Sequence, residues 1–259
     1  MLFRSLLTTG NTHAPIDRVR VITNVFPGRT GAELARTLWV RGHKVTVMSS
    51  QPWTLSDLPD PGQDTERRAT VVGFQTYDDL TTLLQKEVRG GGYDAVVHAA
   101  QVSDYLCAGV YTPDGGTFYN ARTNTWDGRG GKPTLTDHKG GIIPVVEPEV
   151  WVRLMRAPRL IDRFRNPWGF DGVLVEFKQE IGVGDQELVK SAEASRLKCG
   201  ADLAVATTKE GGGHYAYVGP VQERYDRIDR RELADRLALL VEDAHKDRLK
   251  AVPLEPANG

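Results

Sequence analysis

Residues 29–50 read RTGAELARTLWVRGHKVTVMSS, and this stretch predicts a helix, a tight turn and a strand. Residues 29–41 repeat apolar side chains at helical spacing, and Gly42 follows them as a C-cap. The apolar stripe comprises Ala32, Leu34, Ala35, Leu38 and Trp39. Residues 44–50 then follow as a strand. So short a connection between a helix and a strand is typical of α/β proteins.

The alternation of strands and helices continues on both sides of this unit. Upstream, residues 2–8 predict a strand that ends in the turn Thr9-Gly10-Asn11-Thr12. Downstream, the pattern predicts strands at 70–76, 93–100, 145–155, 172–181, 201–208 and 214–219, and helices at 77–89, 158–164, 185–198 and 229–246. We therefore expect one Rossmann-like α/β domain over residues 1–259, with a mainly parallel sheet and helices on both of its faces.

Residues 105–141 interrupt this rhythm. Seven glycines lie between Gly115 and Gly141, among prolines and many polar residues. A connection of this length is rarely passive in a compact domain, so we expect a long glycine-rich flap, either a functional lid or a disordered segment. The charged run 224–236 mixes both signs and is interpreted as the solvated face of the last helix.

Composition excludes several classes of protein. The formal net charge of −1 gives no general attraction for nucleic acid or an anionic membrane. No apolar run approaches the ~18 residues of a membrane span. Cys107 and Cys199 stand far apart, as expected of reduced thiols in the cytoplasm, and the six histidines lack the spacing of a metal site. We expect a cytoplasmic protein with no nucleic-acid or membrane partner and no metal held by its side chains alone.

Three segments combine polar residues with glycine turns. Residues 10–31, GNTHAPIDRVRVITNVFPGRTG, surround a helix start, where free N–H groups and the helix dipole favour an anion. Residues 99–105, AAQVSDY, follow a central strand at the end where open α/β sheets bind ligands. His138-Lys139 lies in the flap. Together these segments predict a site for a phosphorylated small molecule.

At these segments the sequence resembles the phosphopantothenoylcysteine synthetase family. The family writes the first segment as G-x-T-x-x-P-I-D-x-V-R-x-I-x-N-x-S-S-G-x-x-G, which Gly10, Thr12, Pro15, Ile16, Asp17, Val19, Arg20, Ile22, Asn24, Gly28 and Gly31 match. Residues 99–105 match A-A-x-V-S/A-D-Y/F, and His138-Lys139 matches the flap lysine. Residues 154–161, 175–180 and 201–206 resemble further family motifs, so the likeness runs from about residue 6 to residue 246.

The resemblance implies a stand-alone ligase of coenzyme A biosynthesis that joins 4′-phosphopantothenate to L-cysteine. The substrate carboxylate attacks the α-phosphate of CTP or ATP and releases pyrophosphate, and the cysteine amine then displaces the nucleoside monophosphate from the acyl-nucleotide. Mg²⁺ and a lysine stabilise the departing pyrophosphate. The bifunctional form carries a flavin-dependent half upstream of the ligase, and no such half precedes these motifs here, so we expect no flavin. The choice between CTP and ATP stays open.

The resemblance also implies roles for single residues. Asn24 donates its amide to the acyl carbonyl or oxyanion, Lys139 closes over the triphosphate, and Arg20 reaches the neighbouring site of a homodimer. Gly28, Arg29 and Gly31 bind the substrate phosphate. The expected nucleotide-binding residues are Gly10, Ala99, Ala100, Asp104, Lys139, Pro158, Phe177 and Lys198.

The sequence departs from the family pattern at several positions. Phe26-Pro27 replace two serines, Thr207 replaces an asparagine, and the segment between Asp104 and Lys139 is longer than in the common bacterial form. A non-catalytic or substrate-shifted nucleotide-binding relative therefore stays open, as does an NAD(P)-dependent oxidoreductase of the same fold. Against the oxidoreductase, the first turn lacks G-x-G-x-x-G, and Ser49-Ser50 stand where an acidic ribose ligand is expected.

Overall fold

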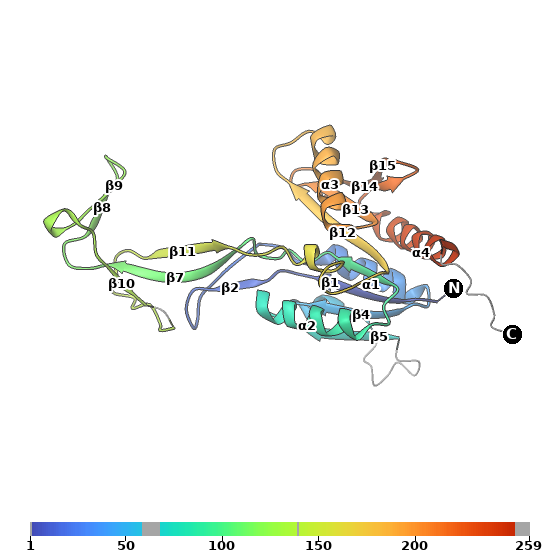
Figure 1. Ribbon diagram of the computed structural model, residues 1–259, viewed down its shortest axis with the longest axis horizontal. Helices are drawn as coiled ribbons and strands as arrows, with labels where there is room; N and C mark the ends of the chain where they lie inside the picture. Colours follow the sequence, from blue (N-terminus) through green and yellow to red (C-terminus); the bar gives the residue numbers. More distant parts are fainter. Residues whose placement is uncertain (1, 59–67, 139, 252–259) are drawn as a thin grey trace.

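The computed structural model describes residues 2–58, 68–138 and 140–251. Its centre is an 8-stranded sheet in the order β15-β14-β13-β12-β6-β1-β4-β5 (Figure 1). The strands of this sheet are β1 (Arg4–Thr9), β4 (Lys44–Ser49), β5 (Ala69–Gly73), β6 (Ala95–His98), β12 (Val173–Glu180), β13 (Leu203–Thr208), β14 (Tyr215–Val221) and β15 (Arg224–Asp229). The six strands from β5 to β13 run parallel, and β14 and β15 add an antiparallel edge.

The parallel strands follow the doubly wound order of Rossmann-type folds. Counted along the chain, they lie side by side as 3-2-1-4-5-6, and the order reverses between β1 and β6. Ligands of open α/β sheets bind at such a reversal, outside the carboxyl ends of the strands. The expected fold class, an α/β protein with a mainly parallel sheet, is confirmed.

Helices cover both faces of the sheet, as expected. Helices α1 (Arg29–Val40) and α4 (Leu233–Ala251) pack on one face, and α2 (Tyr77–Gly90) and α3 (Asp185–Cys199) pack on the other. Because side chains alternate along a strand, Val175 of β12 faces α1 and α4, whereas its neighbour Leu174 faces the α2 side. Helix α2 begins at a capping box formed by Thr76 and Asp79. None of the helices described here combines the length and apolarity required to cross a membrane.

The connection from β1 to α1 contains a hairpin of β2 (His13–Pro15) and β3 (Val21–Thr23) and then returns to the end of β1. Gly28, the N-cap of α1, is left-handed with a φ of 67°. A Cβ on Gly28 would lie 2.8 Å from both Gly10 N and Thr9 Oγ1, and one on Gly31 would lie 2.5 Å from Thr9 Oγ1. Glycine at both positions therefore allows α1 to begin directly against the end of β1.

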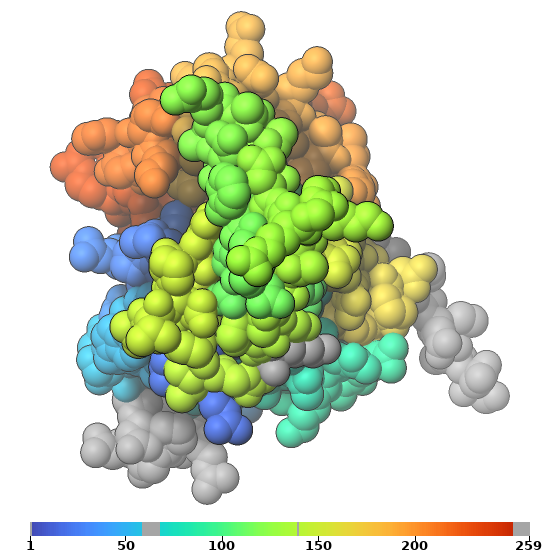
Figure 2. Space-filling view, turned by 90° about the vertical axis from the view of Figure 1, so that its left-hand side faces the viewer, coloured from blue at the N-terminus to red at the C-terminus, as the bar shows by residue number. Residues whose placement is uncertain are grey.

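The glycine-rich segment 105–141 leaves the body of the molecule, but its described part is neither an irregular lid nor a disordered flap. It forms an arm that projects from the central sheet (Figures 1 and 2). Strand β7 (Tyr105–Pro113) lies between β10 (Leu135–Asp137) and β11 (Trp151–Arg156), and β8 (Phe118–Asn120) pairs with β9 (Thr125–Asp127). The short turns η1 (Pro52–Leu55), η2 (Arg129–Gly131) and η3 (Ile161–Arg163) complete the elements. The expected strand 145–155 thus begins only at Trp151.

The charged run 224–236 is also corrected by the structure. Residues 224–229 form β15 at the edge of the sheet, and α4 begins at Leu233 rather than at residue 229. Ile228 of this strand packs into the core, while Tyr225 donates a hydrogen bond to Glu193 of α3 at 2.8 Å. The charged side chains of both signs therefore lie on an edge strand. Their mixture hides the alternation of inward and outward side chains that is typical of a strand.

Candidate functional site

A cavity of about 1290 Å³ opens at the carboxyl ends of the central strands. Its walls come from residues 23–33, from the segments after β6 and at the end of β12, from the loop 207–214 and from the turn 229–233. The cavity lies where the strand order reverses, the position expected for a ligand site in this fold. The predicted site residues that line it are Asn24, Gly28, Arg29, Gly31, Ala99, Asp104 and Phe177.

The chain after β6 stays in register with the chain after β1. Ala99 N donates to Thr8 O at 3.2 Å, and Gln101 N donates to Gly10 O at 2.8 Å. Ala99 and Gln101 therefore face the cavity, whereas Ala100 between them turns to the α2 side of the sheet. Gly10 lies under the cavity, where it supports Gly28, and does not line it.

Asn24 is held through its backbone by buried polar side chains. Asn11 Nδ2 donates to Asn24 O at 2.9 Å, and Gln51 Nε2 donates to both Asn11 Oδ1 and Phe26 O at 3.0 Å. The side-chain amide of Asn24 lines the cavity and has no hydrogen-bond partner within the described part of the chain. It is thus available to a ligand. The sequence indicates only a turn at Asn11, because its burial depends on Ser50 and Gln51 from another strand end.

The first turn of α1 forms the floor of one end of the cavity. Gly28 offers no side-chain cap, the first intrahelical bond runs from Ala32 N to Gly28 O, and the first turn contains no acidic residue. The preceding N–H groups therefore have no intrahelical acceptor, and with the helix dipole they favour a bound anion. Arg29 adds an exposed cation at the same place.

Known proteins share both the sequence pattern and the architecture. Residues 3–112 match the DNA/pantothenate metabolism flavoprotein C-terminal domain. The coenzyme A biosynthesis bifunctional protein CoaBC of Thermococcus kodakarensis is 29% identical over 243 residues, which cover 90% of this chain and 49% of that protein. CoaBC of Methanocaldococcus jannaschii is 23% identical over 206 residues, covering 78% of this chain and 40% of that protein.

The chain spans about half the length of the curated relatives that it matches. Among solved structures, the DNA/pantothenate metabolism flavoprotein from Streptococcus pneumoniae superposes with a TM-score of 0.71 at 22% identity, covering 93% of this chain and 99% of that one. A mutant of Cab2 in complex with phosphopantothenate-cysteine has a TM-score of 0.66 at 15% identity, covering 96% and 88%. These structures share the fold of this chain.

Several residues of the family pattern lie outside the cavity. Arg20 forms an ion pair with Asp17 at 2.5 Å and approaches Ile143 O at 3.4 Å, and 41% of its side chain is exposed. Pro158 and Lys198 lie on the face of the sheet covered by α2 and α3. Lys139 lies outside the described residues. The structure therefore brings together the phosphate and acyl parts of the predicted site, but not Pro158 or Lys198.

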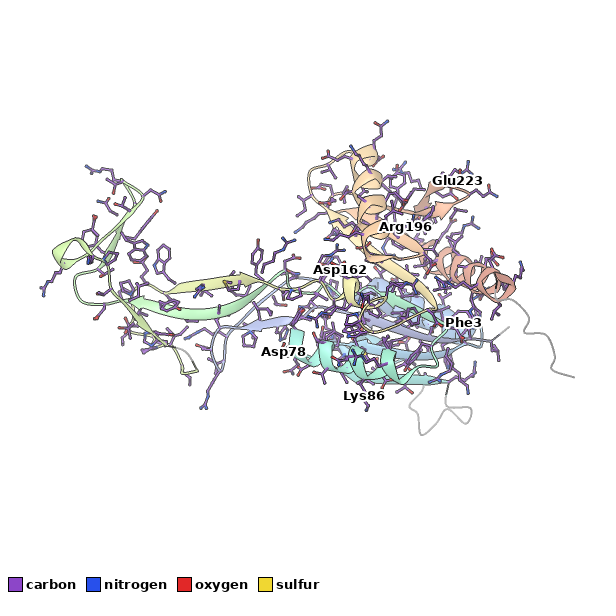
Figure 3. The ribbon with its side chains drawn as sticks, viewed as in Figure 1. Phe3, Asp78, Lys86, Asp162, Arg196 and Glu223 are labelled. Atoms are coloured by element: carbon purple, nitrogen blue, oxygen red, sulfur yellow. The ribbon has the colours of Figure 1, made fainter. Side chains whose placement is uncertain are left out.

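Lys198 and Pro158 flank a separate polar network. Lys198 Nζ lies 3.9 Å from Asp162, which is labelled in Figure 3. Arg159 Nη2 donates to the buried carboxylate of Glu176 at 2.6 Å, and Ser195 Oγ donates to the same oxygen at 2.6 Å. This network ties β12 to α3 on the opposite face of the sheet from the cavity.

Two buried titratable groups, His98 and Cys199, are held in their neutral forms. Burial, with a contribution from the charge of Arg159, lowers the pKa of His98 to about 4, and His98 Nδ1 shares a hydrogen bond with Thr8 Oγ1 at 2.9 Å. Burial, reinforced by the carboxylate of Glu176, raises the pKa of the Cys199 thiol to about 12. At neutral pH Cys199 is therefore a thiol and not a nucleophilic thiolate.

Sequence patterns did not reveal the basic side chains that the C-terminal segments bring to the cavity. The cavity is lined by five lysine and arginine residues and three carboxylates, with His214 in addition. The basic residues are Arg29, Lys178, Lys209, Arg230 and Arg231. The run Asp229-Arg230-Arg231 was the available signal, but it was interpreted as part of a solvated helix. The excess of basic over acidic side chains in the lining of the cavity suits an anionic ligand.

Proposed function

We propose that this chain is a phosphopantothenate–cysteine ligase that joins 4′-phosphopantothenate to L-cysteine through an acyl-nucleotide, with CTP or ATP as co-substrate. The proposal rests on the cavity at the strand-order reversal. This cavity joins an anion-favouring helix start, the free amide of Asn24 and the carboxylate of Asp104. The helix start suits the phosphate of the acid, the amide suits the reacting carbonyl, and the carboxylate suits the Mg²⁺ that accompanies a triphosphate.

In the first step, the carboxylate of phosphopantothenate attacks the α-phosphorus of the nucleotide. A bond from the carboxylate oxygen to phosphorus forms, and the bond from phosphorus to the pyrophosphate oxygen breaks. A carboxylate is already a nucleophile, so the step needs no general base but needs cations on the leaving group. Gly28, Arg29 and Gly31 hold the phosphate of the acid in this proposal, and Lys139 holds the triphosphate.

In the second step, the cysteine amine attacks the acyl carbon and the nucleoside monophosphate leaves with its bonding electron pair. The amine loses one proton as the amide forms. A tetrahedral intermediate carries negative charge on the former carbonyl oxygen, and an amide N–H aimed at that oxygen stabilises it. Asn24 has the required free amide, held in position through Asn11 and Gln51.

Magnesium fits the site as a companion of the triphosphate. The part of the chain that is described contains no group of three or more His, Cys, Asp and Glu side chains that could hold a metal by themselves. Asp104 provides one carboxylate at the cavity. One or two carboxylates together with substrate phosphates are a usual Mg²⁺ environment, and the ion would supply positive charge to the departing pyrophosphate.

We further propose that the protein acts as a homodimer joined through the arm. Arg20 does not line the cavity of its own chain and lies beside Ile143, at the edge of the arm segment. The arm exposes 56% of Phe118, 40% of Leu154 and 50% of Met155, and exposed apolar side chains of this size suit a protein interface. A second copy covering this surface would bring Arg20 toward the neighbouring cavity.

A product assay tests the reaction. The protein is incubated with 4′-phosphopantothenate, L-cysteine, Mg²⁺ and either CTP or ATP, and each phosphate product is quantified. We expect pyrophosphate and nucleoside monophosphate in equal amounts, formed only when phosphopantothenate is present. Orthophosphate with nucleoside diphosphate would contradict the acyl-nucleotide route. Nucleotide binding without turnover would identify a non-catalytic relative.

A further inference from the structure

Asn24 lies in a short segment outside the strands and helices. Pairing of β3 with β2 ends at Thr23, and α1 begins at Arg29. Residues 24–27 between them belong to neither element. In the proposed ligase this segment must hold the amide of Asn24 against a reacting carbonyl, and a misplacement of about 1 Å in such a group can cost about 100-fold in rate. The rigidity of the segment therefore has to come from elsewhere in the fold.

Side chains from the ends of β1 and β4 provide this rigidity. They donate to the backbone carbonyl oxygens of alternate residues along the segment. The three bonds run from Asn11 Nδ2 to Asn24 O at 2.9 Å, from Gln51 Nε2 to Phe26 O at 3.0 Å and from Thr9 Oγ1 to Gly28 O at 2.6 Å. Alternate carbonyls are the groups that a neighbouring strand binds in a sheet, so these side chains take the place of a strand partner.

Gln51 also sets the orientation of the Asn11 amide. Its Nε2 donates to Asn11 Oδ1 at 3.0 Å, which keeps Asn11 Nδ2 turned toward Asn24. If the Asn11 amide rotated by half a turn, two oxygens would face each other in place of a donor and an acceptor. Asn11 is only 5% exposed, so water cannot readily replace the lost bond. Two of the three carbonyl bonds thus depend on Gln51.

The donors of both amides are used inside the protein. A side-chain amide has two N–H donors. Those of Asn11 go to Thr23 Oγ1 and Asn24 O, and those of Gln51 go to Asn11 Oδ1 and Phe26 O. Neither amide belongs to a residue that lines the cavity in the described part of the chain. Gln51 therefore has no donor left for a ligand and acts through the segment that carries Asn24.

We propose that Gln51 is a positioning residue for the second step, the transfer of the acyl group to the cysteine amine. It holds the Asn11 amide and the Phe26 carbonyl, and through them it fixes the side chain of Asn24 against the oxyanion. This inference rests on the proposed ligase function and adds a residue to it. The first step, which forms the acyl-nucleotide, does not use Asn24 and does not depend on Gln51.

The substitution Gln51→Glu tests this role with almost no change of shape. The carboxylate has no N–H to donate and places an oxygen against Asn11 Oδ1 and Phe26 O. In a rapid-quench assay we expect the first turnover to release pyrophosphate at the wild-type rate and to ligate cysteine about 10- to 100-fold more slowly. Ligation at the wild-type rate in Gln51→Glu would overturn the proposal.

Gln75→Glu is the matched control. Gln75 follows β5 by two residues, as Gln51 follows β4, so both substitutions add a negative charge at the same end of the sheet. Gln75 is exposed, and its side chain has no hydrogen-bond partner among the described residues. We expect Gln75→Glu to carry out both steps at the wild-type rates.

A double variant distinguishes positioning from general damage. If Gln51 acts through Asn24, Gln51→Glu will slow ligation no further once Asn24→Ala has removed the amide. If the losses of the two variants multiply, or if Gln51→Glu slows pyrophosphate release as much as ligation, the role of Gln51 is structural and the proposal is overturned. If Gln51→Glu does not fold, Gln51→Met replaces it with the same expected results, because it keeps the length of the side chain and removes both donors.

A measurement without substrates separates this inference from the ligase proposal. NMR relaxation gives the backbone order parameters of residues 24–26, and we expect about 0.85 in the wild type and in Gln75→Glu but below about 0.6 in Gln51→Glu. Low order parameters in Gln51→Glu, together with no pyrophosphate release by the wild type, refute the ligase and support the hold of Gln51 on this segment. Unchanged order parameters in Gln51→Glu refute the positioning role alone.

Discussion

Substitution of Gly28 by alanine tests whether the helix start must lie directly against the end of β1. Gly28 has a φ of 67° and a ψ of 11°, a left-handed conformation. An added Cβ would lie 2.8 Å from Gly10 N and from Thr9 Oγ1. The Gly10 contact is with the backbone of the adjoining turn and cannot be relieved by a rotamer change. Helix α1 would have to move away from β1.

Gly130 provides the matched control. It has a φ of 70° and a ψ of 20°, and a Cβ added there would meet no heavy atom within 4 Å. Gly130→Ala should therefore cost only the left-handed strain, roughly 1–2 kcal/mol, and part of that is offset in the unfolded chain. Gly28→Ala adds an overpacking cost of about 1–3 kcal/mol to the same strain. The difference between the two variants isolates the cost of the close approach.

Urea unfolding at 25 °C measures both costs, and calorimetry measures the affinity for 4′-phosphopantothenate. We expect Gly28→Ala to be less stable than Gly130→Ala by about 1–3 kcal/mol. It should also bind phosphopantothenate at least about 10-fold more weakly, because the N–H groups of α1 are displaced from their anion. Equal losses of stability in the two variants would refute the packing argument. Wild-type affinity in Gly28→Ala would refute the role of this helix start in binding.

Four further predictions concern the site, the core and the arm. Asn24→Asp should still release pyrophosphate once per site, but its cysteine ligation step should lose several kcal/mol of transition-state stabilisation. Equal ligation rates of the wild type and this variant in a rapid-quench assay would remove Asn24 from the mechanism. Lys139→Gln should lose about 10²–10³ in kcat/KM without a change in thermal unfolding, so an active or an unfolded variant counts against it. Burial lowers the pKa of His98 to about 4, whereas a histidine in the unfolded chain titrates near 6.5. The contribution of His98 to the free energy of unfolding is therefore complete above pH 6.5 and is lost as the pH falls toward 4. Urea unfolding should show a loss of about 3 kcal/mol in the free energy of unfolding of the wild type over this pH range, and no such loss in His98→Gln. If the free energy of unfolding depends on pH in the same way in both proteins, this prediction is wrong. Replacing both Leu154 and Met155 by glutamate should give monomers in sedimentation, and an unchanged dimer would place the interface elsewhere.

The long, regular elements of this fold followed from local sequence patterns. Helix α1 was expected at 29–41 and spans Arg29–Val40, and β12, α3 and β13 also lie within two residues of their expected bounds. Apolar periodicity determines these elements because each packs one continuous face on the sheet. The ordered motifs likewise identified most of the residues that form the near wall of the cavity.

Only the tertiary structure decided the arm, the edge strand β15 and the far wall of the cavity. In the arm, β7 pairs with β11 across more than 30 residues of intervening chain. Glycine-rich composition predicted an irregular flap here, because a pairing partner so far away along the chain leaves no local signal for a strand. Arg230 contacts α1 and Asn11 contacts the end of β4, and no local pattern reveals these contacts between distant parts of the chain. Pro158 and Lys198 belong to the same motif series as Phe177 but lie across the sheet from it. Spacing along the chain determines helices and strands, whereas which side chains share a cavity depends on the order and the faces of the assembled strands.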